Sequence, residues 1–151
     1  MKVCIVIGTR PEIIKMSPLI RACQNQKLDF FILHTGQHFS PNMDSDIFND
    51  LELPKPKYNL KTGGIPYNLQ ISQMIQKMSE IFIKERPKVV FVQGDTNSVL
   101  AGALAANKLT IQVGHHEAGL RSHDLSMPEE VNRILTDNIS DFLFVPTKDV
   151  L

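Results

Sequence analysis

The chain has 151 residues, enough for one ordinary domain with a single sizeable core. Apolar residues make up 42% of it, and 16 basic and 16 acidic residues cancel to a net charge of zero. This balance creates no field that would attract nucleic acid or an anionic membrane surface, so neither partner is expected. Any anion that the protein binds must be held by a local site.

The cysteines and the apolar runs bear on the compartment. Cys4 falls in an apolar run and Cys23 in a helical pattern, without metal-ligand spacing, which favours free buried thiols in a reducing cytosol. The opening apolar run is too short for a signal-peptide core, and no apolar run approaches the roughly 20 residues of a membrane span. We expect a cytoplasmic protein.

Short apolar runs alternate with segments of helical periodicity. The runs are continuous, as expected of strands buried on both faces. Strands are predicted at 3–7, 30–33, 89–92, 111–113 and 142–145, and helices at 11–23, 44–51, 69–83, 98–107 and 129–139. Between the second strand and the helix at 69–83, only the short helix at 44–51 and a proline-rich connection are predicted. The pattern at 147–151 indicates a further helix, which suggests a chain that is cut short.

This alternation predicts an α/β fold, a Rossmann-like doubly wound parallel sheet covered on both faces by right-handed crossovers. No internal repeat, low-complexity stretch or linker-like composition divides the chain. We therefore expect one domain over residues 1–151. In such a sheet, ligands bind beyond the carboxyl ends of the strands, and every prominent polar cluster of the chain stands there.

The first cluster, at 8–12, follows the first strand. Gly8 permits a tight turn, the next helix begins with its positive end toward the turn, and Arg10 adds a fork of donors for phosphate oxygens. Lys15 lies a little over one helical turn further on. A turn glycine with solvated charges is the alternative interpretation. The cluster has neither the dinucleotide-binding nor the Walker spacing, so those two functions lose support.

The second cluster, at 93–98, places Asp95 directly after the strand at 89–92. Its ordinary role would be to cap the next helix, which aspartate and threonine both do well. Thr96 could supply that cap and leave Asp95 free for chemistry. The sequence leaves both interpretations open.

The third cluster, at 114–121, places Glu117 at a strand end between two glycines, which allow a close approach of chain or ligand. His115 and His116 precede it. Adjacent residues on a strand point to opposite faces, so one shared metal ion is not expected. In the fourth cluster, at 127–133, Glu130 lies in a proline-led first helical turn, where acidic residues are also ordinary helix-start chemistry.

Three carboxylates and an arginine that converge on one rim would suit proton transfer to and from a sugar diphosphate. In this order the clusters resemble the non-hydrolysing UDP-N-acetylglucosamine 2-epimerases. Each motif is weak alone, but the set is highly specific to that family or a close relative. The motifs are Gly8-Thr9-Arg10-Pro11-Glu12-Ile13-Ile14-Lys15, Thr35-Gly36-Gln37-His38, Gly94-Asp95-Thr96, Glu117-Ala118-Gly119-Leu120-Arg121 and Pro128-Glu129-Glu130-Val131-Asn132-Arg133.

The resemblance implies the N-terminal half of a two-domain, glycosyltransferase-B-type fold with the active site in the cleft between the domains. The C-terminal UDP-binding domain would be absent here. The family's reaction eliminates UDP to leave a 2-acetamidoglucal and adds it back with the proton on the other face, which interconverts UDP-N-acetylglucosamine and UDP-N-acetylmannosamine. It needs no nicotinamide, metal or other cofactor. This isomerase half is expected to be inactive alone and to serve the synthesis of cell-surface polysaccharide.

The resemblance also implies roles for single residues. Three of them would be the acid–base carboxylates, with no assignment of which removes the C2 proton: Asp95, Glu117 and Glu130. Five others would contact the UDP-sugar, with the first of them near the diphosphate: Arg10, Lys15, Gln37, His38 and Arg133. The expected partners are a separate C-terminal domain or subunit, and a second copy in a homodimer, docked on an exposed apolar patch.

Two departures narrow the comparison. His116 stands where the family usually has a small apolar residue, and residues 39–43 differ from the bacterial members that carry an allosteric substrate site. Regulation by UDP-N-acetylglucosamine is therefore not expected. The same segment is similar to archaeal members and to the diacetamido-uronate epimerases, so the choice of UDP-2-acetamido sugar stays open.

Three other interpretations stay open. A glycosyltransferase of the same architecture would transfer the sugar to an acceptor without exchanging the C2 hydrogen. A receiver-like signalling domain needs an acidic pair after its first strand, where this chain has Gly8-Thr9-Arg10. A stand-alone half could bind the sugar nucleotide weakly or pair with a separately made C-terminal half.

Overall fold

The computed structural model describes residues 1–37 and 41–148. Over these residues strands and helices alternate. The strands are β1 Lys2–Ile7, β2 Asp29–His34, β3 Tyr58–Asn59, β4 Val89–Gln93, β5 Gln112–His116 and β6 Phe142–Phe144. The helices are α1 Arg10–Asn25, α2 Pro41–Asp50, α3 Tyr67–Glu85, α4 Asn97–Lys108 and α5 Pro128–Ile139.

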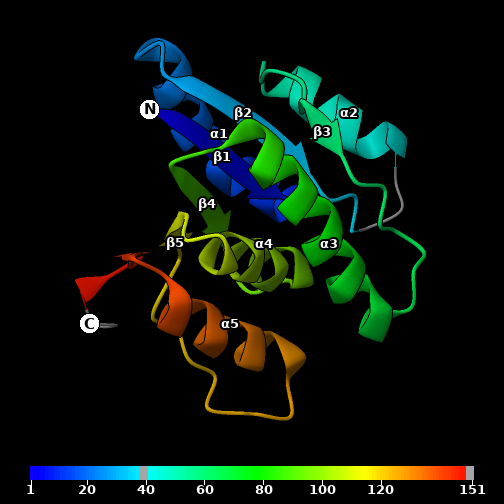
Figure 1. The fold of residues 1–151 in the computed structure, drawn as a ribbon, viewed down its shortest axis with the longest axis vertical. Coiled ribbons are helices and arrows are strands. Elements are labelled where there is room, and N and C mark those ends of the chain that lie inside the picture. Colours follow the sequence, from blue (N-terminus) through cyan, green and yellow to red (C-terminus); the bar gives the residue numbers. More distant parts are fainter. Residues whose placement is uncertain (38–40, 149–151) are drawn as a thin grey trace.

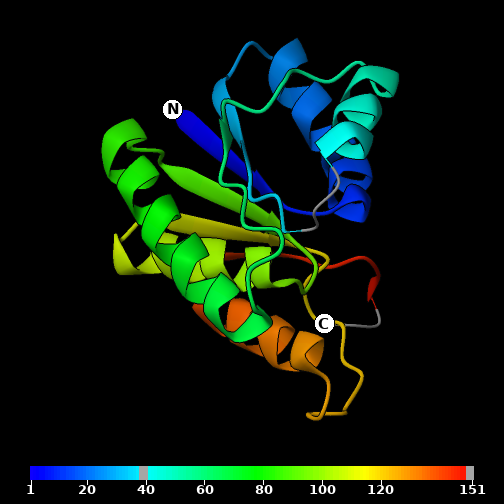
Figure 2. The same cartoon turned by 90° about the vertical axis from the view of Figure 1, so that its right-hand side faces the viewer.

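The described strands form one parallel sheet in the order β3-β2-β1-β4-β5-β6. Helices α1 and α2 cover one face, and α3, α4 and α5 cover the other (Figures 1 and 2). The order reverses between β1 and β4, and such a switch point leaves a crevice at the carboxyl ends of the two strands. The predicted doubly wound, Rossmann-like sheet is confirmed.

A separate apolar core fills each side of the sheet. Ile5 and Ile7 of β1 pack with α1 on one side, and Val92 of β4 packs with Met78 of α3 on the other. All four side chains are no more than 2% exposed, so each contributes about 1.5–3 kcal/mol of hydrophobic stabilisation. The alternation of β1 between the two cores explains its continuous apolar run.

Two strands differ from the sequence pattern. β3 was not predicted, because its two residues pair only with Leu33 and His34 and are too few to show a periodicity. β6 is an edge strand whose Phe142, Leu143 and Phe144 are 44%, 51% and 47% exposed. An exposed apolar surface is therefore present there. Among the described residues, no helix is long and apolar enough to cross a membrane.

Candidate active site

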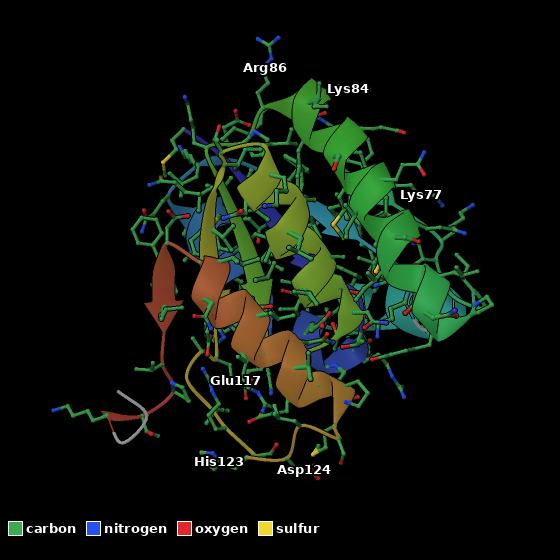
Figure 3. The ribbon with its side chains drawn as sticks, turned by 60° about the horizontal axis from the view of Figure 1, so that its bottom comes forward. Lys77, Lys84, Arg86, Glu117, His123 and Asp124 are labelled. Atoms are coloured by element: carbon green, nitrogen blue, oxygen red, sulfur yellow. The ribbon has the colours of Figure 1, made fainter. Side chains whose placement is uncertain are left out.

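A cavity of about 280 Å³ opens at the switch point, beyond the carboxyl ends of β1 and β4. The turn before α1, the turn before α4, the loop after β5 and helix α5 all contribute to its wall. Four of the predicted site residues line it together, namely Lys15, Asp95, Glu117 and Arg133. Figure 3 shows Glu117 at the same end of the molecule as His123 and Asp124, with Arg86 at the opposite end.

Glu117 projects into this cavity from a turn that follows β5. Its backbone has φ 69°, which is a left-handed conformation. This conformation is unfavourable for any residue other than glycine, and it is often retained at functional sites. Its carboxylate accepts hydrogen bonds from Lys15 Nζ at 2.7 and 2.9 Å, and another from Gln93 Nε2. A carboxylate and a lysine that are both partly exposed are thus held together at the cavity wall.

Asp95 does not cap helix α4, so of the two roles that the sequence left open for it, the capping role is excluded. Thr96 occupies the N-cap position of α4, and Asp95 Oδ2 accepts a hydrogen bond from Arg133 instead. The carbonyl oxygen of Asp95 accepts from Asn132 Nδ2 at 3.0 Å. Both the side chain and the backbone of Asp95 are therefore held by α5.

Glu130 lies behind Arg133 and does not line the cavity. It is 1% exposed, and its carboxylate accepts hydrogen bonds from Arg133 and from the backbone N–H groups of Ser122 and His123, both at 3.0 Å. The N–H of Ser122, above all, lowers the pKa of Glu130. In this arrangement Glu130 fixes the loop after β5 and orients Arg133.

Two further predicted substrate contacts, Arg10 and Gln37, do not line the cavity. Arg10 is exposed at the first position of α1. Gln37 Oε1 accepts hydrogen bonds from the backbone N–H of Ser98 at 3.0 Å and from its hydroxyl at 2.7 Å, which ties the end of β2 to α4. His38 is outside the residues that the structure describes.

Glu12 is a cavity residue that was not singled out from the sequence. It is 2% exposed, and one carboxylate oxygen accepts from the backbone N–H groups of Gly8 and Thr9, the latter at 3.0 Å. The other oxygen accepts from the Thr96 hydroxyl at 2.6 Å. Burial raises the pKa of Glu12 to about 7. The Thr9-x-x-Glu12 spacing of a capping box was the signal available.

Gly8 is required for a different reason than the predicted tight turn. A Cβ atom there would lie 2.1 Å from Ser98 Oγ and 2.3 Å from Thr35 Oγ1, so only glycine fits between these hydroxyls. Gly94, by contrast, has φ 83°, a conformation that favours glycine. Among the described residues, no group of three or more histidine, cysteine, aspartate or glutamate side chains could hold a metal ion.

Comparison with known proteins gives the family. The model of the UDP-N-acetylglucosamine 2-epimerase family matches residues 21–150. The chain belongs to this family. A UDP-N-acetylglucosamine 2-epimerase of Methanocaldococcus jannaschii is 56% identical over 148 residues, which are 98% of this chain and 40% of that protein. The chain thus spans about two fifths of the length of this relative.

Other members of the family extend the comparison. The UDP-2,3-diacetamido-2,3-dideoxy-D-glucuronate 2-epimerase of Pseudomonas aeruginosa is 48% identical over 98% of this chain and 42% of its own length. The crystal structure of the M. jannaschii enzyme in complex with UDP-GlcNAc and UDP superposes with a TM-score of 0.96, at 55% identity, over 99% of this chain and 41% of that one. The expected likeness to archaeal members and diacetamido-uronate epimerases is confirmed.

The fold extends beyond the family. A Streptomyces glycosyltransferase, SsfS6, superposes over 92% of this chain and 42% of its own with a TM-score of 0.51. At 14% identity this match shows the fold alone. The α/β architecture predicted for the N-terminal half of a glycosyltransferase-B-type protein is thereby confirmed.

Proposed function

We propose that this chain is the first domain of a UDP-N-acetylglucosamine 2-epimerase and binds the UDP-sugar at the switch-point cavity. The observation that carries the proposal is that Asp95 and Glu117 line one cavity together with Lys15 and Arg133. Two carboxylates beside two cations can serve a reaction that moves a proton while a diphosphate leaves and returns. The M. jannaschii relative, whose structure is described as a complex with UDP-GlcNAc and UDP, supports this choice of ligand.

In the proposed reaction, a carboxylate takes the C2 proton as the C1–oxygen bond to UDP breaks, and a proton then returns to the other face of C2 as UDP adds back. Asp95 and Glu117 are the candidates for these transfers. Lys15 and Arg133 are now paired with carboxylates. The Lys15–Glu117 pair is partly open to solvent, so Lys15 can turn toward a diphosphate, while Arg133 is held between Asp95 and Glu130 and adds a fixed positive charge at the cavity wall.

Further residues act around this centre in the proposal. Glu130 supports the chemistry by holding Arg133 and the loop after β5. Arg10, Gln37 and His38 stay as proposed substrate contacts, with Arg10 near the diphosphate. Arg10 is exposed beyond the cavity wall, where it can reach a ligand that extends out of the cavity.

A related sugar nucleotide is the second candidate substrate. The P. aeruginosa diacetamido-uronate epimerase is 48% identical over 98% of this chain, so the N-terminal residues alone do not separate the two substrates. Both reactions invert C2 and use the same two carboxylates in the proposal. A sugar transfer to an acceptor has only the fold likeness at 14% identity in its favour.

The proposal includes a second domain. The relatives are about two and a half times as long as the matched part, and most UDP-holding groups would come from their remaining length. Removing one side of a cleft removes the positioning on which the rate depends, so this chain alone should not turn over. A homodimer, a cytoplasmic location and a role in making cell-surface polysaccharide stay predictions.

Proton NMR of UDP-N-acetylglucosamine in D₂O tests the proposal. The chain is assayed alone, and then joined to the remaining part of the M. jannaschii relative. Deuterium at C2 and a manno product only in the joined protein are the expected result. Deuterium exchange at C2 by the chain alone would contradict the proposal that this chain holds only part of the active site. No exchange by a folded joined protein would overturn the substrate assignment and direct the assay to a diacetamido-uronate substrate.

A further inference from the structure

His115 is fully buried directly beneath the candidate site, and the function proposed above does not use it. Its exposed fraction is 0%. Its Nδ1 lies 2.6 Å from Asp137 Oδ1, and its Nε2 lies 2.7 Å from the carbonyl oxygen of Gly94. The ring therefore bridges the end of β4 and helix α5.

The partners of the ring determine where its hydrogens lie. A carbonyl oxygen only accepts, so Nε2 of His115 donates to Gly94. Asp137 Oδ2 accepts from the backbone N–H of Gly119 at 3.1 Å and forms an ion pair with Arg121 at 2.6 Å. The hydrogen between Nδ1 and Oδ1 is then held in a short charge-assisted bond. A ring turned over would place carbon atoms against both oxygens.

The two ends of this pair reach the turns that carry the two cavity carboxylates. On one side, Gly94 is the residue directly before Asp95, so the carbonyl group that His115 holds belongs to the peptide that leads into Asp95. On the other side, Gly119 and Arg121 follow Glu117 in the loop after β5. One buried pair is thus bonded to both turns.

We propose that His115 and Asp137 form a positioning pair that sets the Asp95 turn relative to the Glu117 turn. Neither residue lines the cavity, so both act through backbone groups rather than on the substrate. Burying two ionisable side chains against each other is a poor means of stabilising a fold, since apolar residues of similar volume often do as well or better. Here the second hydrogen bond of the ring reaches the Asp95 turn through Gly94, and both further contacts of the carboxylate reach the Glu117 turn through Gly119 and Arg121.

Two amide substitutions at His115 each remove one of the two hydrogen bonds of the ring and keep the other. In His115→Gln, the amide nitrogen can reach the place of Nε2 and keep the bond to Gly94, while the bond to Asp137 is lost. In His115→Asn, the shorter amide can reach the place of Nδ1 and keep Asp137, while the bond to Gly94 is lost. Both variants introduce a neutral amide, so a difference between them shows which hydrogen bond was lost, the one to Asp137 or the one to Gly94.

NMR of the isotope-labelled chain in water is the measurement. In the wild type we expect a ring N–H signal far downfield for the hydrogen between Nδ1 and Asp137. The Asn variant should shift the carbonyl carbon of Gly94 and the amide of Asp95, and leave the Gly119 amide close to the wild type. The Gln variant should do the reverse and speed hydrogen exchange at Gly119 by roughly tenfold, the worth of one hydrogen bond.

A milder variant keeps the test decisive if either substitution at His115 prevents folding. The side chain of Arg121 is 29% exposed, so Arg121→Gln leaves the buried pair in place and weakens only its connection to the Glu117 turn. We expect signals of residues 117–121 to shift and those of Gly94 and Asp95 to stay. Equal shifts at both turns in every folded variant, or none at either, would overturn the positioning role.

The consequence for catalysis rests on the proposed function, whereas the NMR pattern does not. In the joined protein, kcat for C2 inversion should fall about tenfold or more in the Asn variant with KM within about twofold, because a displaced Asp95 weakens the transition state more than binding. The Gln variant should retain more of kcat. If the wild type shows the NMR pattern but no C2 exchange, the positioning pair stands and the epimerase assignment falls.

Discussion

Two nearly buried glutamates at opposite ends of the sheet differ in what holds them. Glu85 ends α3 beside the amino end of β1, and its carboxylate accepts from Lys57 at 2.8 Å, Tyr58 at 2.6 Å and Lys2 at 2.9 Å. Lys57, followed by Tyr58 and Lys2, lowers the pKa of Glu85 to about 2. Glu12, at the carboxyl end, has neutral donors, and burial raises its pKa to about 7. Charged partners at Glu85, and burial among neutral donors at Glu12, therefore shift the two pKa values in opposite directions.

The cavities at the two ends of the sheet also differ in the charges that line them. A cavity of about 370 Å³ lies at the amino end, between the end of α3 and the turn after α4, and is larger than the one at the switch point. Its wall carries Arg86 and Lys88 among apolar residues and contains no carboxylate. A cavity of about 380 Å³ between the start of α3 and α5 is also larger, so size alone would not have selected the switch point. The convergence of opposite charges selects the switch point.

The largest expected effect is a loss of activity on substitution at the carboxyl end of the sheet but not at the amino end. In the joined protein, Asp95→Asn and Glu117→Gln should each lower kcat for C2 inversion by about 10²–10⁴-fold, the usual worth of an acid–base group. Glu85→Gln should leave kcat within about twofold, since Glu85 is paired with Lys2 at the amino end of β1, at the far end of the sheet. Circular dichroism checks that all three variants are folded. Near-normal turnover in both Asp95→Asn and Glu117→Gln would remove these residues from the mechanism.

The next effect is on the pH dependence of stability, where the two glutamates act with opposite signs. The folded pKa of Glu85 is depressed to about 2, so its stabilisation is present above about 4.5 and lost as pH falls through 2. The folded pKa of Glu12 is raised to about 7, so its contribution is present below about 4.5 and lost as pH rises through 7. For Glu12 the loss amounts to up to about 3 kcal/mol.

Urea unfolding of the chain between about pH 2 and about pH 8, roughly the span of both transitions, measures this contrast. Glu12→Gln should remove the decline in the free energy of unfolding between about pH 4.5 and 7, because a neutral amide can accept from Gly8 and Thr9 without ionising. Glu85→Gln should instead lower stability by about 2 kcal/mol above pH 5, as it removes hydrogen bonds to charged groups. An unchanged slope in Glu12→Gln would show that Glu12 ionises without cost.

The sequence allowed the scaffold to be predicted more fully than the site. Continuous apolar runs such as 89–92 indicated buried strands because both faces of β4 are covered, and every predicted strand and helix within the described residues is present. The motifs placed Asp95 and Glu117 at strand ends, and the parallel sheet brings such ends together. Long-range partners could not be predicted, since nothing local shows that Arg133 bridges Asp95 and Glu130, or that Ser98 excludes a side chain at Gly8.

Backbone strain gives the smallest expected effect and the closest comparison between the two ends. Glu117 has φ 69° at the site, and Arg86 has φ 51° at the end of α3. Glycine relieves the strain of a left-handed conformation by roughly 1 kcal/mol, so Arg86→Gly should raise the free energy of unfolding by about 0.5–1 kcal/mol and leave kcat unchanged.

Glu117→Gly gains the same relief of strain but loses the ion pair with Lys15, which is worth about 0.2–1 kcal/mol. Its stability should therefore stay within about 1 kcal/mol of the wild type while activity is lost. Strain at Arg86 then only ends a helix, whereas strain at Glu117 is retained because it aims a carboxylate into the cavity. A loss of more than about 2 kcal/mol in Glu117→Gly would instead make Glu117 a residue that the fold requires.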